Sequence, residues 1–207
     1  MLIGLNKAAA AACIATALVA PMAVWAQGPT GIGALQIGLT KAQVAALPAR
    51  GVHLASPLAV APKEDFASAP PAGEERFTTT VVTPWRSQPL DSSLTFQDGK
   101  LAFITLRWRN DSMLMTNVVA QVSEKFGPAK ESDERRVESC PTYGGASERI
   151  SSGMLTRSWK LIKGKQVIMT GASTLINDSC MGRREGKEPS EINMLLISAV
   201  DNVENPF

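Results

Sequence analysis

The spacing of apolar residues predicts a helix over 111–126. Its apolar side chains recur at intervals of three and four, so they form one stripe on a helical surface. Asp111 or Ser112 can cap the first turn, and Gly127-Pro128 is a strong helix stop. The stripe consists of Met115, Val118, Val119, Val122 and Phe126. We interpret it as a face that packs against a hydrophobic core.

A second, shorter helix is expected over Thr40–Leu47. Thr40 and Gln43 have the spacing of a capping box, in which each side chain bonds to the backbone of the other residue. Leu39 and Val44 are placed to form a hydrophobic staple across this cap. Pro48 then ends the helix, because proline disfavours helical backbone in the residue before it.

From Phe77 the apolar period changes to two, which is typical of β-strands. Strands are expected over Phe77–Thr83, Ser93–Gln97 and Lys100–Arg109. Asp98-Gly99 joins the last two as a hairpin turn, since both residues tolerate the positive φ that such turns require.

A regular two-residue turn also fixes the register of this hairpin. It pairs Phe96 with Leu101 and Leu94 with Phe103, so these four side chains share one face. The opposite face then carries Ala102, Ile104, Leu106 and Trp108. Both faces are therefore expected to be partly apolar, and the hairpin is either covered on both sides or leaves one face for a partner.

The C-terminal third contains a second predicted hairpin, Leu155–Thr170, with Lys163-Gly164 at its turn. A mostly apolar strand is expected over Ile192–Val200. The intervening stretches, including 140–145 and Asn177–Ser190, show no periodicity and are expected to be loops.

Residues 48–76 are rich in Pro and Ala and predict an extended connection, with one strand near Val52–Val60. So long a stretch without regular structure is unusual inside a compact domain. We therefore interpret it as either a functional loop or a poorly ordered one.

Together these elements predict an α+β fold, in which an antiparallel sheet packs against two short helices. Each hairpin is preceded by a short helix, and the tripeptide Asn-Asp-Ser recurs at 110–112 and 177–179. A tandem repeat of a helix-plus-hairpin unit is an alternative that this recurrence leaves open.

Residues 1–26 have the composition of a cleavable secretory signal peptide. Lys7 precedes an apolar stretch over 8–24, and Ala26 ends the segment with a small residue before the cut. The stretch is shorter than the roughly 20 apolar residues of a spanning helix. The alternatives are a membrane anchor and a lipoprotein cut before Cys13.

Cleavage would leave residues 27–207 as a single domain, located in the periplasm or secreted, with no transmembrane segment. Its cysteines would be Cys140 and Cys180, and two thiols in an oxidising compartment favour one disulfide. The alternative is a redox-active or nucleophilic thiol. This part of the chain has 20 basic and 19 acidic residues. Such a balance does not favour a nucleic-acid partner.

The sequence lacks residues that common hydrolytic mechanisms require. His53 is the single histidine, whereas hydrolytic triads and most zinc sites use at least one imidazole. Motifs for phosphate binding, serine hydrolases and zinc proteases are absent as well. We therefore expect no catalytic, cofactor or metal site. A hydrolase that uses acidic residues brought together by folding stays open as an alternative.

Two groups of residues have the composition of a protein-binding surface. Trp and Arg, which often dominate binding energy at interfaces, occur at Trp85 and in Arg107-Trp108-Arg109. The alternative for this group is a buried Trp flanked by solvated arginines. Tyr143 lies in a loop beside Cys140, and a disulfide there would reduce the entropy that the loop loses on binding.

The segment Gly38-Leu39-Thr40-Lys41-Ala42-Gln43-Val44 resembles the helix opening of small bacterial envelope proteins of the SmpA/OmlA (BamE) type. The segment Asp98-Gly99-Lys100-Leu101 and the helix end Lys125-Phe126-Gly127-Pro128 are similar to their layout. Those proteins share a helix-and-hairpin unit with β-lactamase inhibitor protein, which has two units in tandem. They are lipid-anchored and shorter, and residues 48–76 have no counterpart in them. The resemblance implies an architecture and no functional residue.

The sequence therefore predicts an exported, non-enzymatic protein of the bacterial envelope that binds another protein, as an adaptor or as an inhibitor or immunity protein. One alternative is a cell-wall or glycan hydrolase. The other is a carrier of a small apolar ligand, which would show an empty apolar cavity between helix and sheet.

Overall fold

The computed structural model describes residues 30–62, 71–141, 146–163 and 166–201. The predicted signal peptide, residues 1–26, lies outside the described residues. The elements, in chain order, are β1 (Gly31–Ile32), β2 (Leu35–Gln36), α1 (Lys41–Ala45), β3 (His53–Leu54), β4 (Ala59–Val60), β5 (Glu74–Thr83), β6 (Arg86–Gln97), β7 (Lys100–Arg109), α2 (Ser112–Phe126), β8 (Lys130–Asp133), β9 (Arg136–Pro141), β10 (Ser147–Lys163), β11 (Gln166–Asn177), α3 (Cys180–Arg184) and β12 (Ser190–Asp201).

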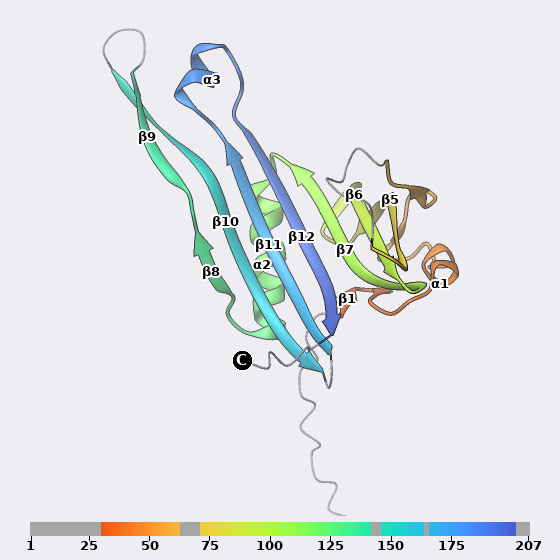
Figure 1. Cartoon of the computed structure of the whole chain (residues 1–207). Coiled ribbons are helices and arrows are strands. Elements are labelled where there is room, and N and C mark those ends of the chain that lie inside the picture. Colours follow the sequence, from red (N-terminus) through yellow and green to blue (C-terminus); the bar gives the residue numbers. More distant parts are fainter. Residues whose placement is uncertain (1–29, 63–70, 142–145, 164–165, 202–207) are drawn as a thin grey trace, which may run out of the picture.

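A large antiparallel sheet dominates the molecule, and α2 lies across one of its faces (Figure 1). The strand order is β3-β5-β6-β7-β12-β11-β10-β8, with β4 also paired to β5 and β9 to β10. The chain builds β5, β6 and β7 as a meander, follows α2 to the edge strand β8, and returns through β10 and β11. The last strand, β12, then pairs with β7 and joins the two meanders into one sheet.

The α+β class that the sequence predicts is wrong, because the fold is mostly β. Strands account for 58% and helices for 16% of the described residues. The error comes from strands that are polar on both faces. Every residue of β8 is exposed, and in β9 only Cys140 is buried. No apolar alternation marks such strands, so the sequence pattern gives no sign of them.

The two predicted helices are present. Thr40 caps α1 with the complete capping box, since its side chain accepts from Gln43 N and the Gln43 side chain accepts from Thr40 N. Asp111 caps α2, with its Oδ1 accepting from Leu114 N at 2.9 Å. The predicted apolar stripe of α2 packs into the core: Met115, Val118 and Val122 are buried, and Val119 and Phe126 are partly buried.

Two indole groups fix the ends of α2 against the sheet. Trp108 Nε1 on β7 donates to the carbonyl of Asp111 at 3.2 Å, at the start of the helix. Trp159 Nε1 on β10 donates to the carbonyl of Gly127 at 2.9 Å, where the helix ends. The sheet therefore holds α2 at both ends, as well as through its apolar stripe.

The predicted hairpin of β6 and β7 is present, with Asp98 and Gly99 at φ values of 51° and 77°. Phe96 faces Leu101 as predicted, but Leu94 faces Ile104 rather than Phe103. A bulge beside Phe96 causes this difference.

The bulge leaves Ala102 without a partner in the register, because Thr95 pairs with Phe103 and the next residue pairs with Leu101. One extra residue shifts the following side chains to the other face. The buried apolar residues of this hairpin now share a single face: Leu90, Leu94, Phe96, Leu101, Ile104, Leu106 and Trp108. The expectation of two partly apolar faces was therefore wrong.

The predicted second hairpin is also present, since β10 and β11 pair up to Lys163 and Gln166. It is not equivalent to the first hairpin, however. The pair β6 and β7 is the second hairpin of the meander β5-β6-β7, whereas β10 and β11 form the first hairpin of the meander β10-β11-β12. The two turns that suggested the tandem repeat therefore do not hold equivalent positions. A helix nevertheless precedes each three-stranded meander, α1 before β5, β6 and β7, and α2 before β10, β11 and β12.

The Pro/Ala-rich connection adds to the edge of the sheet. Where one strand was expected near Val52–Val60, β3 and β4 each pair with β5. Val52 and Ala61 are buried. The part from 63 to 70 lies outside the described residues.

Candidate functional site

Part of the sheet extends beyond its body and forms a projection that we call the finger. It consists of β9, residues 147–153 of β10, and residues 176–191, which include α3. The last pairing of β7 with the sheet joins Arg109 to Ile192, and the finger begins beyond it. Figure 1 shows these segments projecting past the ends of β7 and α2.

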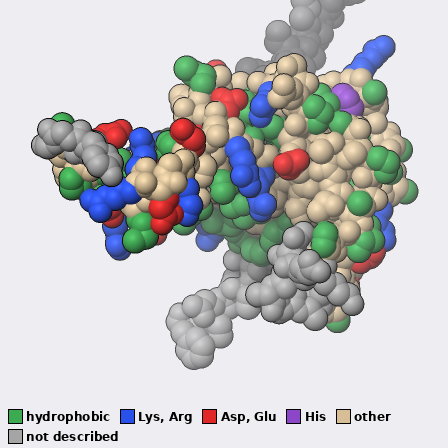
Figure 2. Space-filling view, turned by 90° about the horizontal axis from the view of Figure 1, so that it is seen from above, with side chains coloured by type: hydrophobic (Ala, Val, Ile, Leu, Met, Phe, Trp, Pro, Cys, Tyr) green, Lys and Arg blue, Asp and Glu red, His purple; other side chains and the backbone are tan. Residues whose placement is uncertain are grey.

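The finger has almost no hydrophobic core. Among its described residues only Cys140 and Ile150 are buried, and α3 has no buried residue. Figure 2 shows basic and acidic side chains next to one another over this part of the surface. Its charged residues are Arg136, Glu138, Glu148, Arg149, Asp178, Arg183, Arg184, Glu185, Lys187, Glu188 and Glu191. Hydrophobic burial therefore cannot be what holds the finger in shape.

Two cross-links hold the finger instead. The predicted disulfide between Cys140 and Cys180 is present and ties β9 to α3. Arg183, also on α3, donates from Nε and Nη2 to the two carboxylate oxygens of Asp178, each at 2.8 Å, and from Nη1 to Glu148 Oε1 at 3.3 Å. One covalent and one ionic contact thus join the β9–β10 ribbon to the loop that carries α3.

The ion pairs of this region are strong enough to affect proton binding. The Arg183 side chain donates to Asp178 and lowers the pKa of that carboxyl group. At the base of the finger, hydrogen bonds from the side chain and backbone of Arg135 lower the pKa of Asp133 to about 2. Both carboxyl groups therefore take up a proton at a lower pH than an ordinary aspartate does.

This shift makes stability depend on pH in a defined direction. Because the pKa of Asp133 is lower in the folded chain than in the unfolded chain, its contribution is present above about pH 4 and disappears as the pH falls through about 2. We expect Asp133→Asn to be less stable than wild type at pH 7 and equal to it below pH 2. Urea unfolding across this range measures the difference. Arg135→Gln should reproduce the loss, and a gap between wild type and Asp133→Asn that persists below pH 2 would contradict this cause.

Gly153 lies where the ribbon leaves the sheet. Its φ is +109°, and a Cβ atom there would lie 2.6 Å from the carbonyl oxygen of Glu134 and 3.0 Å from Arg135 Cα. The backbone N–H of Glu134, between β8 and β9, donates to the carbonyl of Met154 at 2.8 Å, so this segment cannot easily move away. Position 153 of β10 therefore requires glycine, because it lies where the pairing partner of β10 changes from β8 to β9.

We expect Gly153→Ala to lower the free energy of unfolding by about 1–3 kcal/mol, through backbone strain and the clash with Glu134. Thermal unfolding measures the loss, and limited proteolysis should show earlier cleavage in the finger. Gly171→Ala is the matched control, because Gly171 lies in the same sheet, has no positive φ and has open space at its Cβ position. Equal effects of the two substitutions would refute the role assigned to Gly153.

The residues that the sequence suggests for partner binding do not form one surface. Trp85 is half-buried, and its Nε1 donates to Gln121 Oε1 at 2.7 Å. Trp108 is buried on the helix-covered face. Arg107 and Arg109 are exposed and alternate with Trp108 along β7, so they point to the opposite face. Both indoles thus make contacts within the fold, while the two arginines face solvent.

Tyr143 lies outside the described residues, so its predicted role stays a prediction. The structure adds Met181, which directly follows Cys180 and is 72% exposed on α3. An exposed Met beside a disulfide cysteine in a charged segment was the signal available in the sequence. Val137 on β9 is also exposed.

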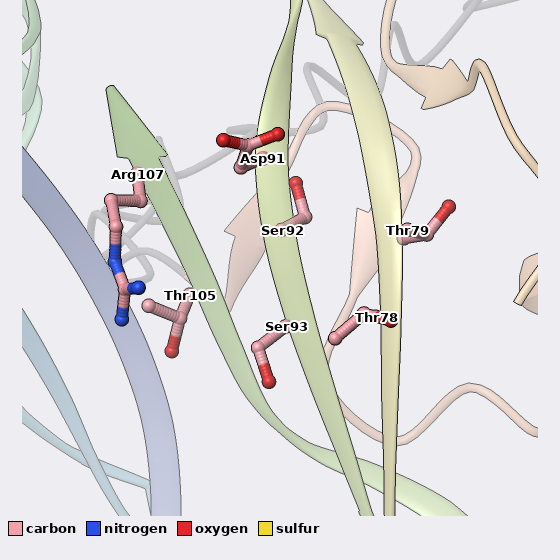
Figure 3. Close-up of a pocket in the computed structure, with 7 residues that line it drawn as sticks. All are labelled: Thr78, Thr79, Asp91, Ser92, Ser93, Thr105 and Arg107. Carbon is pink, nitrogen blue, oxygen red and sulfur yellow. The ribbon is translucent and has the colours of Figure 1, made fainter. Parts of the chain in front are cut away.

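The open face of β5, β6 and β7 carries a shallow pocket of about 450 Å³. It is lined by Thr78, Thr79, Asp91, Ser92, Ser93, Thr105 and Arg107 (Figure 3). The Arg107 side chain is directed away from Asp91. Asp91 is the one acid among these described lining residues, whereas glycoside hydrolysis by carboxylates uses two. The pocket thus does not contain the acid pair that the hydrolase alternative needs.

Within the described residues, no group of three or more His, Cys, Asp or Glu is placed to hold a metal ion. The helices of the same part of the chain are all too short or too polar to cross a membrane. Comparison with known proteins finds no matching family model, no matching curated protein and no matching solved structure.

Proposed function

We propose that this chain is an exported, non-enzymatic protein of the bacterial envelope that binds another protein through its finger, as an adaptor or as an inhibitor. The observation that carries the proposal is the finger itself, which is exposed, almost coreless and cross-linked. The finger buries almost no apolar side chains, so it contributes little to the hydrophobic core of the protein. An exposed segment that is held in one shape is suited to binding a partner.

Cross-linking matters because ordering a flexible segment costs free energy when it binds. An isolated two-stranded ribbon is at best marginally stable in water. The Cys140–Cys180 disulfide and the Arg183–Glu148 contact order the ribbon and the α3 loop before any partner arrives. Preorganisation of this kind improves affinity, since less conformational entropy is lost in the complex.

The chemistry of the surface also favours a protein partner. Met181 and Val137 are 72% and 59% exposed and lie among side chains of both charges. Interfaces typically combine apolar contacts with a polar rim, and Met is enriched in them. Mixed charge gives no preference for a polyanion such as nucleic acid.

The disulfide supports export as well. Disulfide bonds persist in oxidising compartments such as the periplasm and are rare in the cytosol. The composition of residues 1–26 is that of a signal peptide. Both observations agree with a periplasmic or secreted protein.

A matched pair of substitutions tests the proposal. Met181→Glu adds a charge to the finger, and Met113→Glu adds the same charge to α2, where Met113 is 69% exposed and outside the finger. In affinity capture from envelope extract, we expect a stoichiometric partner with wild type and with Met113→Glu, and its loss with Met181→Glu. Equal capture by all three proteins, or no stoichiometric partner, would overturn the proposal.

A further inference from the structure

A cavity of about 680 Å³ lies on the helix-covered face of the sheet, away from the finger. Its walls come from the second half of α2, from the segment around β1, from Val52 just before β3, from the turn between β5 and β6, and from the core side of β11 and β12. This volume falls within the range of about 300–1,000 Å³ that is usual for small-molecule sites.

The buried part of the cavity wall is mainly apolar. Ile32, Val122, Leu195 and Ile197 line it and are 5%, 9%, 1% and 2% exposed. Trp85 and Phe126 contribute aromatic surface and are half-buried. An apolar molecule would therefore find apolar contacts on several sides.

One polar group in this wall has no partner. Thr170 is 1% exposed, and its Oγ1 forms no hydrogen bond within the described part of the chain. A buried hydroxyl without a partner is unfavourable, because it has lost its contacts with water and gained nothing in exchange. Thr170 lies among the residues that line the cavity, but its Oγ1 is itself buried. A bound molecule would therefore supply the missing hydrogen bond once the Thr170 side chain turns its hydroxyl toward the cavity.

The remaining polar groups indicate the charge of that molecule. The Gln121 amide oxygen already accepts from Trp85 Nε1 at 2.7 Å. Glu124 and Lys125 are exposed at the rim and carry opposite charges. Neither a cation nor an anion is therefore favoured by the rim.

We propose that this cavity binds a small, uncharged and mainly apolar molecule with one hydrogen-bonding group, which pairs with Thr170 Oγ1. The site is separate from the finger, so the protein has a ligand site in addition to its proposed partner surface. Chain alcohols and neutral lipid fragments have this chemistry.

The test uses N-phenyl-1-naphthylamine, an uncharged apolar fluorophore with a single N–H group, added to the full disulfide-bonded chain. We expect saturable binding at one site per chain. Thr170→Val keeps the shape of the side chain and removes the hydroxyl, so it should weaken binding about fivefold, which is the worth of one ordinary hydrogen bond. Val122→Phe should abolish binding by filling the cavity, with circular dichroism to confirm that it folds.

Thr83→Val is the matched control. Thr83 is also buried with an unpartnered Oγ1, but it is not among the residues that line the cavity. It should leave affinity for the probe unchanged, as should Met181→Glu in the finger. Absence of saturable binding, as would occur if the chain's own terminal residues filled the cavity, would overturn the proposal. Equal affinities of Thr170→Val and Thr83→Val would overturn it too.

Discussion

Replacing Cys140 and Cys180 together with serine should lower the free energy of unfolding by about 4 kcal/mol. The two cysteines are 40 positions apart, and the enclosed loop contains β10 and β11. In the unfolded chain the disulfide restricts this loop, so removing it increases the entropy of the unfolded state. Urea unfolding of the oxidised wild type and the double variant measures the difference.

Reduced wild type serves as the control and should unfold like the double variant. The slope of free energy against urea should also change, since the unfolded chain exposes more surface without the cross-link. A loss below about 1 kcal/mol would mean that the disulfide orders the finger only locally and does not stabilise the whole chain.

Phe96→Ala should lower the free energy of unfolding by about 3–5 kcal/mol. The Phe96 side chain is fully buried, and its ring meets that of Phe77 edge-on, with centroids 5.6 Å apart and an interplanar angle of 85°. Truncation removes this contact and leaves a cavity beside the bulge of β7. Chemical denaturation, read by circular dichroism, gives the magnitude.

Met113→Ala is the comparison for Phe96→Ala. Met113 is 69% exposed on α2, and surface substitutions of this kind usually change stability by less than about 0.5 kcal/mol. If both substitutions had similar effects, the core described around β6 and β7 would be incorrect.

The sequence was most informative where structure is set by neighbouring residues. The capping box at Thr40 and Gln43 and the turn at Asp98-Gly99 are both present, since each depends on contacts within a few residues. The disulfide was also predictable, because the predicted mature chain holds two cysteines and the predicted compartment is oxidising.

Features that depend on distant residues could not be predicted. The bulge at Ala102 depends on how β7 packs between β6 and β12, and one inserted residue was enough to reverse the predicted faces. Strand β9 and the outer part of β10 are polar, and they are strands only because they pair with each other. The fold class failed for this reason.

In the candidate site, too, some features could be predicted from the sequence and others could not. The disulfide anchor was found from the sequence, and the need for glycine at Gly153 was not, because it arises from the approach of Glu134. The cavity around Thr170 combines residues from six parts of the chain. The resemblance to BamE-type proteins stays a prediction.

The central claim is that the finger contacts another protein. The most direct measurement places a photo-crosslinking amino acid at position 181 in living cells, with position 113 on α2 as the control. Both positions are similarly exposed, at 72% and 69%. We predict one discrete adduct of higher mass from position 181, none from position 113, and loss of the adduct when Cys140 and Cys180 are replaced. No adduct at position 181, or the same adduct from both positions, would contradict the claim.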